Sequence, residues 1–301
     1  MKKAMLGVAL VLLSLLFMAN GYAEYNEETA AEALKLTVQA YLSHRDFSVL
    51  AQDGYYDYVP FHEGKLAEEQ SGQADTSGSF FDSCTGFVSA RNEMMNGQMK
   101  TVIYISFQGT QYLEDLLKDA FLARTSGDEL HAGFAKHTNE FIEMKERDEI
   151  AFESLGGKTL KTIFGEMAAG SQNYHIVTTG HSLGGATASM LAQTLIAKVG
   201  LPANAVSCYT FASPKTNYTP STTENPFVNP ENYLIFNFVN DADIITHVGA
   251  HYRAGQDIPF EIPDYDGGRL WKTILNALAL PSGVALNPAG AAAVLKSITT
   301  T

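Results

Sequence analysis

The sequence predicts an α/β fold built on a mostly parallel sheet with helices on both faces. Strand-like apolar runs alternate with helical runs between residues 174 and 239, which is typical of parallel strands joined by crossover helices. A Gly-x-Ser-x-Gly pattern at 180–184 separates one such strand from the helix after it, as a sharp strand-to-helix turn requires. The length of 301 residues suits a single core.

The first part of the chain is predicted to contain one helix and one hairpin. Residues 27–44 have the spacing of an amphipathic helix. The apolar residues expected to share one face of it are Ala31, Leu34, Val38, Tyr41 and Leu42. Strands over 84–91 and 100–107 flank the dipeptide Asn96-Gly97, which favours an antiparallel hairpin.

The remaining elements follow in order along the chain. A short helix over 111–122 and a longer one over 131–148 precede Gly156-Gly157, and another helix ends near residue 169. The core pattern then comprises strand 174–179, helix 183–199, strand 205–212, a polar loop over 215–231 and strand 233–239.

The N-terminus has the pattern of a cleavable secretory signal. A pair of lysines precedes an uncharged apolar stretch over 4–18, which is short for a membrane span. A small-x-small cleavage site ends at Ala23, so we expect a secreted or periplasmic protein. The alternative is an uncleaved N-terminal anchor. The expected organisation is a signal peptide at 1–23 and a single domain at 24–301.

The net charge and the cysteine content limit the ligands and partners that the protein is expected to bind. The formal net charge is −13, which argues against nucleic acid and against a strongly anionic lipid surface. An exported chain permits a disulfide between its two cysteines, Cys84 and Cys208. However, Cys208 lies in an apolar run that predicts a buried strand, so two buried free thiols are favoured, and a metal site is not expected.

The Gly-x-Ser-x-Gly pattern predicts a serine nucleophile at Ser182. The pattern follows a β-branched run and opens a helix whose first turns are rich in small residues. Side chains at positions 180 and 184 would collide on so sharp a turn, and glycine occupies both. The following helix N-terminus favours developing negative charge. A serine nucleophile further needs a base, a carboxylate that orients the base, and N–H donors for an oxyanion.

Five segments in order carry a resemblance to a known family. They are Ile105-Ser106-Phe107-Gln108-Gly109-Thr110, Leu130-His131-Ala132-Gly133-Phe134, Thr179-Gly180-His181-Ser182-Leu183-Gly184-Gly185-Ala186, Tyr209-Thr210-Phe211-Ala212-Ser213-Pro214-Lys215 and Phe238-Val239-Asn240-Asp241-Ala242-Asp243-Ile244-Ile245. Together they resemble the F-R-G-T/S, V-H-x-G-F, nucleophile, T-F-G-S-P-R and V-N-x-x-D-I-V segments of the class 3 lipases, the fungal-lipase-like branch of the α/β-hydrolases.

The resemblance implies a secreted serine carboxylic-ester hydrolase, most simply a lipase, that works without a cofactor. It places an acyl intermediate on Ser182 and oxyanion donors at the Leu183 N–H and at Thr110. The family often has arginine where this chain has Gln108, which puts the hydrogen bonds around the oxyanion segment in doubt, though not the donor itself.

The orienting carboxylate is expected just after a strand that follows the elbow. Asp241 and Asp243 both close the strand over 233–239. Asp243 matches the family position directly before Ile244-Ile245 and is the preferred assignment. Asp241 would then be a turn or capping residue.

The catalytic histidine is not assigned by the sequence. In the family it lies near the C-terminus, past the last strand, whereas no histidine follows His251 in this chain. His247 matches a non-catalytic position, and His181 occupies the position before the nucleophile. Three interpretations stay open: the chain stops before the histidine, His251 serves from an unusual loop, or the triad is incomplete and the protein binds without catalysis.

Substrate identity is open within the class of esters. In the family a short lid follows the oxyanion segment, and residues 111–122 are either that lid or a core helix with the same apolar spacing. The resemblance implies a lipid or other carboxylic ester as partner, with transient contact to a lipid–water interface. Alternatives are an esterase or acyltransferase on non-lipid esters, and a non-catalytic binding protein.

Overall fold

The computed structural model defines most of the predicted core. It describes residues 25–41, 47–63, 84–95, 97–109, 132–146, 150–217, 233–240 and 243–259. The expected signal peptide, Thr110, segment 111–122, Asp241 and the chain beyond Pro259 lie outside the described residues. Within the described part, no helix is long and apolar enough to cross a membrane.

A seven-stranded sheet forms the centre of the molecule. Its strands, in spatial order, are β1 (Tyr56–Glu63), β2 (Cys84–Met95), β3 (Gln98–Phe107), β6 (Tyr174–His181), β7 (Val206–Phe211), β8 (Leu234–Val239) and β9 (Gln256–Pro259). β1, β2 and β3 pair in antiparallel fashion, and every pairing from β3 to β9 is parallel. The predicted fold class and the predicted hairpin are confirmed, with both hairpin strands longer than expected.

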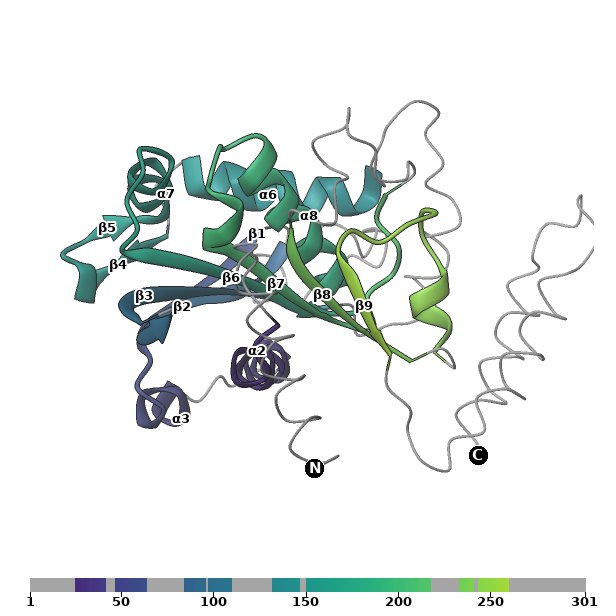
Figure 1. Cartoon of the computed structure of the whole chain (residues 1–301), viewed down its shortest axis with the longest axis horizontal. Helices are drawn as coiled ribbons and strands as arrows, with labels where there is room; N and C mark the ends of the chain where they lie inside the picture. Colours follow the sequence, from purple (N-terminus) through teal and green to yellow (C-terminus); the bar gives the residue numbers. More distant parts are fainter. Residues whose placement is uncertain are drawn as a thin grey trace, which may run out of the picture.

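Helices cover both faces of this sheet (Figure 1). The helices are α2 (Glu27–Gln39), α3 (Phe47–Gln52), α6 (Ala132–Glu146), α7 (Leu160–Ala168) and α8 (Leu183–Ala197). Between α6 and α7, a two-stranded sheet of β4 (Ala151–Phe152) and β5 (Lys158–Thr159) encloses η1 (Glu153–Leu155). The sequence indicated only an interruption there, at two glycines that both have positive φ.

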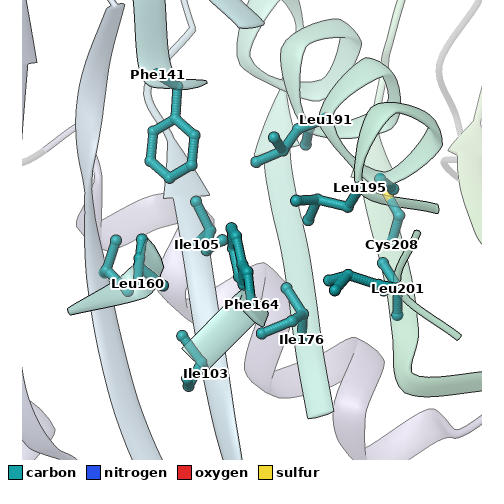
Figure 2. Packing of buried hydrophobic residues seen from close by; sticks show 14 of the residues in the cluster. Ile103, Ile105, Phe141, Leu160, Phe164, Ile176, Leu191, Leu195, Leu201 and Cys208 are labelled. Carbon is teal, nitrogen blue, oxygen red and sulfur yellow. The ribbon is translucent and has the colours of Figure 1, made fainter. Parts of the chain in front are cut away.

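Strand alternation divides the core into two layers. Ile103 and Ile105 of β3 face the α6, α7 and α8 side, whereas Val102 and Tyr104 face α2. On the first side, Figure 2 shows aromatic and aliphatic side chains from the three helices meeting the sheet. The fully buried contributors include Phe141, Phe164, Leu191, Leu195 and Ile176. Burial of each such side chain contributes about 1.5–3 kcal/mol to folding.

α8 is buried along almost its whole length, from Leu183 to Leu195. It contacts β6 and β7 on one side and α6 on the other, so its apolar character all round has a physical explanation. The predicted helix over 183–199 is therefore confirmed. Its N-terminus lies at the carboxyl end of β6, which is where the candidate nucleophile is found.

The predicted buried face of the N-terminal helix is wrong. Leu34 is 46% exposed and Val38 is 55% exposed. The buried residues of α2 are Thr29, Ala30, Ala33, Leu36 and Thr37. Small side chains bring the helix backbone close to the sheet, where Thr37 Oγ1 lies 2.8 Å from Thr179 Oγ1 and Ser106 Oγ donates to the Leu36 carbonyl at 3.1 Å. The face with small residues is therefore buried, because it packs more closely on the sheet than the bulkier face of Leu34 and Val38.

One serine–histidine contact lies in the core of the sheet. His175 Nε2 is 2.9 Å from Ser207 Oγ, joining the first halves of β6 and β7. Both residues are buried. Burial, assisted by the charge of Lys100, lowers the pKa of His175 to about 4. The imidazole is thus neutral in the folded protein, and its position in the closed core is that of a structural group.

His175 is expected to make the protein acid-sensitive. An unfolded histidine has a pKa near 6.5, so between about pH 6.5 and pH 4 the unfolded chain binds a proton that the folded chain does not. Stability conferred by neutral His175 is complete above this window and falls by roughly 3 kcal/mol across it. Urea unfolding of wild type and His175→Gln at several pH values measures this, because the glutamine variant lacks that part of the pH dependence. If the free energy of unfolding changed equally with pH in the two proteins, His175 would not be the source of the acid sensitivity.

Candidate active site

Ser182 occupies the turn between β6 and α8. Its backbone has φ 56° and ψ −125°, a region that costs a non-glycine residue about 1–3 kcal/mol. The Ser182 N–H donates to the Phe211 carbonyl at 3.0 Å, and its own carbonyl accepts from the Ala186 N–H at 3.2 Å. These bonds hold the strained turn in place, and the side chain takes no part in capping the helix.

The flanking glycines are required by the closeness of neighbouring backbone. A Cβ at position 180 would overlap the carbonyl group of Gly184 and lie 2.8 Å from the nitrogen of Gly185. A Cβ at position 184 would lie 2.5 Å from the Phe107 oxygen of β3. Both distances are shorter than real Cβ contacts. Glycine is therefore required at positions 180 and 184, as the Gly-x-Ser-x-Gly pattern predicted.

The oxyanion candidates lie on two adjoining segments. Leu183 begins α8, so its N–H has no carbonyl partner within the helix. Thr110 lies outside the described residues, but Gly109 directly before it packs so tightly on the elbow that a Cβ there would overlap the His181 carbonyl oxygen. Gln108, which replaces the family's arginine, donates its N–H to the Thr85 carbonyl at 2.9 Å.

Asp243 follows β8, as the sequence predicted. It caps η4 (Ile244–His247), and its Oδ1 accepts from the Ile245 N–H at 2.9 Å. His181 is exposed by its surface area, yet the protein around its ring lowers its pKa by desolvation, and the negative charge of Asp243 opposes that shift. The carboxylate therefore contributes to the electrostatic environment of the residue before Ser182.

An arginine that the sequence analysis did not single out joins the acid segment to the elbow. Arg253 Nη1 donates to the Ser213 carbonyl at 3.3 Å and also to the Thr246 carbonyl. Ser213 in turn packs against Gly185, since a Cβ on that glycine would meet the Ser213 Cβ at 3.0 Å. Arg253 also pairs with Asp257 of β9 at 3.1 Å. Nothing in the local pattern marks this residue, because its partners come from three separate segments.

A second strained residue lies beside Ser182. Ala212 has φ 50°, in the left-handed region that costs an L-residue roughly 1–2 kcal/mol. Its N–H donates to the Phe238 carbonyl at 2.9 Å, while the preceding carbonyl of Phe211 accepts from Ser182. The T-F-G-S-P-R segment, which residues 210–215 resemble, has glycine at the position of Ala212. A glycine at that position is a sequence signal of a positive φ.

The two histidines after Asp243 are exposed. The His251 N–H donates to the Asn217 carbonyl at 3.0 Å, and its ring lies against Tyr252 with centroids 6.2 Å apart. In the part of the chain that the structure describes, no imidazole forms a hydrogen bond with Ser182 Oγ. Ser182 and Asp243 thus lie on the elements where the sequence predicted them, whereas no base is identified among the described residues.

The fold and the elbow define the class of protein, an α/β-hydrolase. Residues 104–252 match the model of the family described as lipase (class 3). The chain belongs to the class 3 lipase family.

Similarity to solved structures agrees with this fold. The lipase from Rhizopus microsporus var. chinensis is 18% identical, with 79% of this chain and 77% of that chain covered and a TM-score of 0.50. A deletion mutant of the Rhizomucor miehei lipase propeptide complex is also 18% identical, with 79% of this chain and 69% of that chain covered and a TM-score of 0.50. A third structure, of a fungal lipase, is 14% identical, with 80% of this chain and 83% of that chain covered and a TM-score of 0.50. No curated protein matches the sequence.

Proposed function

We propose that the protein is an exported serine carboxylic-ester hydrolase of the lipase type, which acts through an acyl intermediate on Ser182. The observation that carries the proposal is the strained Ser182 at the start of α8, held by hydrogen bonds on both sides. Export rests on the predicted signal peptide at 1–23, and the domain is proposed to span 24–301.

The reaction follows from the chemistry of an activated serine. Ser182 Oγ attacks the ester carbonyl carbon as a base removes its proton, and a tetrahedral oxyanion forms. N–H groups of Leu183 and Thr110 stabilise that oxyanion. Collapse of the intermediate expels the alcohol, which takes the proton from the base. Water then attacks the acyl-Ser182 by the same route and releases the carboxylic acid.

Asp243 would orient the base and stabilise its protonated form. Its position after β8 and its electrostatic effect on His181 support this role. The sequence order Ser, Asp, His leaves His247 and His251. Because His247 matches a non-catalytic position of the resembled segment, His251 is the in-chain candidate for the base. Full activity of a His251→Ala variant would remove that candidate.

Residues 24–301 should hydrolyse p-nitrophenyl esters, and the activity should be lost on treatment with a phosphonate ester. Mass spectrometry should find one phosphonyl adduct, on the peptide that contains Ser182. A chain-length series from acetate to palmitate then distinguishes an esterase from a lipase. Adduct formation elsewhere, or turnover that survives the reagent, would count against the proposal.

A binding protein on the same fold is the second candidate. The observation that favours it is that no imidazole is bonded to Ser182 among the described residues. It predicts a folded protein that binds lipid or ester ligands but shows neither turnover nor adduct. Acyl transfer would instead appear as a new ester or amide product when an alcohol or peptide acceptor is added.

A further inference from the structure

The hydroxyl group of Tyr41 lies at the junction of the elbow and the oxyanion segment. Tyr41 Oη is 2.9 Å from His181 Nδ1 and 3.5 Å from the His181 carbonyl oxygen. The Gly109 backbone lies close enough to this phenol to act on its pKa, which it lowers against the larger effect of burial. Contact with Gly109 is so close that a Cβ at that position would overlap Tyr41 Oη.

The residues that meet there each precede a candidate catalytic group. His181 comes directly before Ser182, and Gly109 comes directly before Thr110. One phenol oxygen thus connects the segment of the nucleophile with the segment of the second oxyanion donor. Tyr41 itself follows α2 and lies 140 positions before His181, so its role could not be inferred from local spacing.

The state of the phenol fits a hydrogen-bond donor. Burial raises the pKa of Tyr41 to about 12, so the hydroxyl keeps its proton at neutral pH. Its nearest acceptor is Nδ1 of His181, whose pKa desolvation lowers. A neutral His181 that accepts at Nδ1 carries its proton on Nε2. The edge-on ring contact, with centroids 5.8 Å apart, keeps the imidazole in one orientation.

The hydroxyl is not needed to dock the helix. α2 is already held by the buried Ala33 and Leu36 and by the Thr37–Thr179 hydrogen bond. Loss of the Tyr41 hydroxyl would leave those contacts intact. Its effect should therefore be local to the junction of the two catalytic segments.

We propose that Tyr41 is a positioning residue that fixes the separation between the nucleophile elbow and the oxyanion segment. The inference rests on the proposed function, in which Leu183 and Thr110 donate to the same oxyanion. Two donors from different segments act together only if both lie within hydrogen-bond distance of one oxygen. A displacement of about 1 Å is enough to cost up to about 100-fold in rate.

The test is a Tyr41→Phe variant, which removes one oxygen and keeps the ring. The expected result is a fall in kcat of about 10- to 100-fold, with KM within twofold and an unchanged melting temperature. Tyr55→Phe is the matched control. It removes a phenol hydroxyl that donates to Glu32 at 2.9 Å, on the same side of the sheet, and should leave kcat unchanged.

Wild-type kcat in Tyr41→Phe would overturn the proposal. So would equal losses in both variants that follow the melting temperature, because these indicate a structural role. Hydrogen exchange provides a second readout that needs no activity. Tyr41→Phe should speed amide exchange in the peptides around residues 109 and 181, and Tyr55→Phe should not. If wild type shows no serine-dependent turnover, the proposed function fails, and the exchange result alone decides the positioning role.

Discussion

Replacing Ser182 with alanine is expected to lower kcat for ester hydrolysis by about 10⁴-fold or more. The hydroxyl is the proposed nucleophile, and removal of a serine nucleophile leaves only the contribution of binding and oxyanion donors. Alanine keeps the Cβ, and the Ser182 side chain does not cap α8. The melting temperature should therefore change little, and initial rates with p-nitrophenyl esters measure the effect.

Ser189→Ala is the matched control for this variant. Ser189 is also buried and lies two turns further along α8, so the same atom is deleted from the same helix. Its kcat should match wild type. Ser182→Gly adds an independent check, since glycine accepts a φ of 56° without strain and should melt above the alanine variant. Undiminished turnover by Ser182→Ala would assign the nucleophile elsewhere.

Gly180→Ala is expected to destabilise the protein by roughly 3 kcal/mol. The added methyl group would overlap the carbonyl group of Gly184 and approach the Gly185 nitrogen, and these are backbone atoms that cannot rotate away. α8 would have to shift from β6, at the overpacking cost seen in closely packed cores. Urea unfolding followed by circular dichroism measures the free energy of unfolding.

Gly165→Ala provides the comparison within the same protein. Gly165 lies inside α7, and an added Cβ there meets nothing within 4 Å. Alanine is the better helix former by about 0.8–1.0 kcal/mol, so this variant should be more stable than wild type. A Gly180→Ala variant as stable as wild type would show that the elbow can relax, and the steric argument for the glycine would then be incorrect.

The sequence alone determined the features that depend on neighbouring residues. The alternation of strands and helices from residue 174 onward predicted the parallel sheet, because each crossover is encoded within one continuous stretch. The elbow was likewise recognisable, since Gly180, Ser182 and Gly184 restrict one another within five residues. The position of Asp243 after β8 followed from the end of a strand.

Only the tertiary structure decided which distant residues meet. Apolar spacing selected Leu34 and Val38 as the buried face of α2, but the smaller side chains of Ala30 and Ala33 allowed a closer approach to the sheet. The meeting of Tyr41 with His181 and Gly109 depends on that docking, as the bond from Arg253 to Ser213 depends on the packing of two loops. The periodicity of apolar residues identifies the faces that a helix can bury. Close packing against the rest of the protein determines which face is buried and which distant residues its side chains contact.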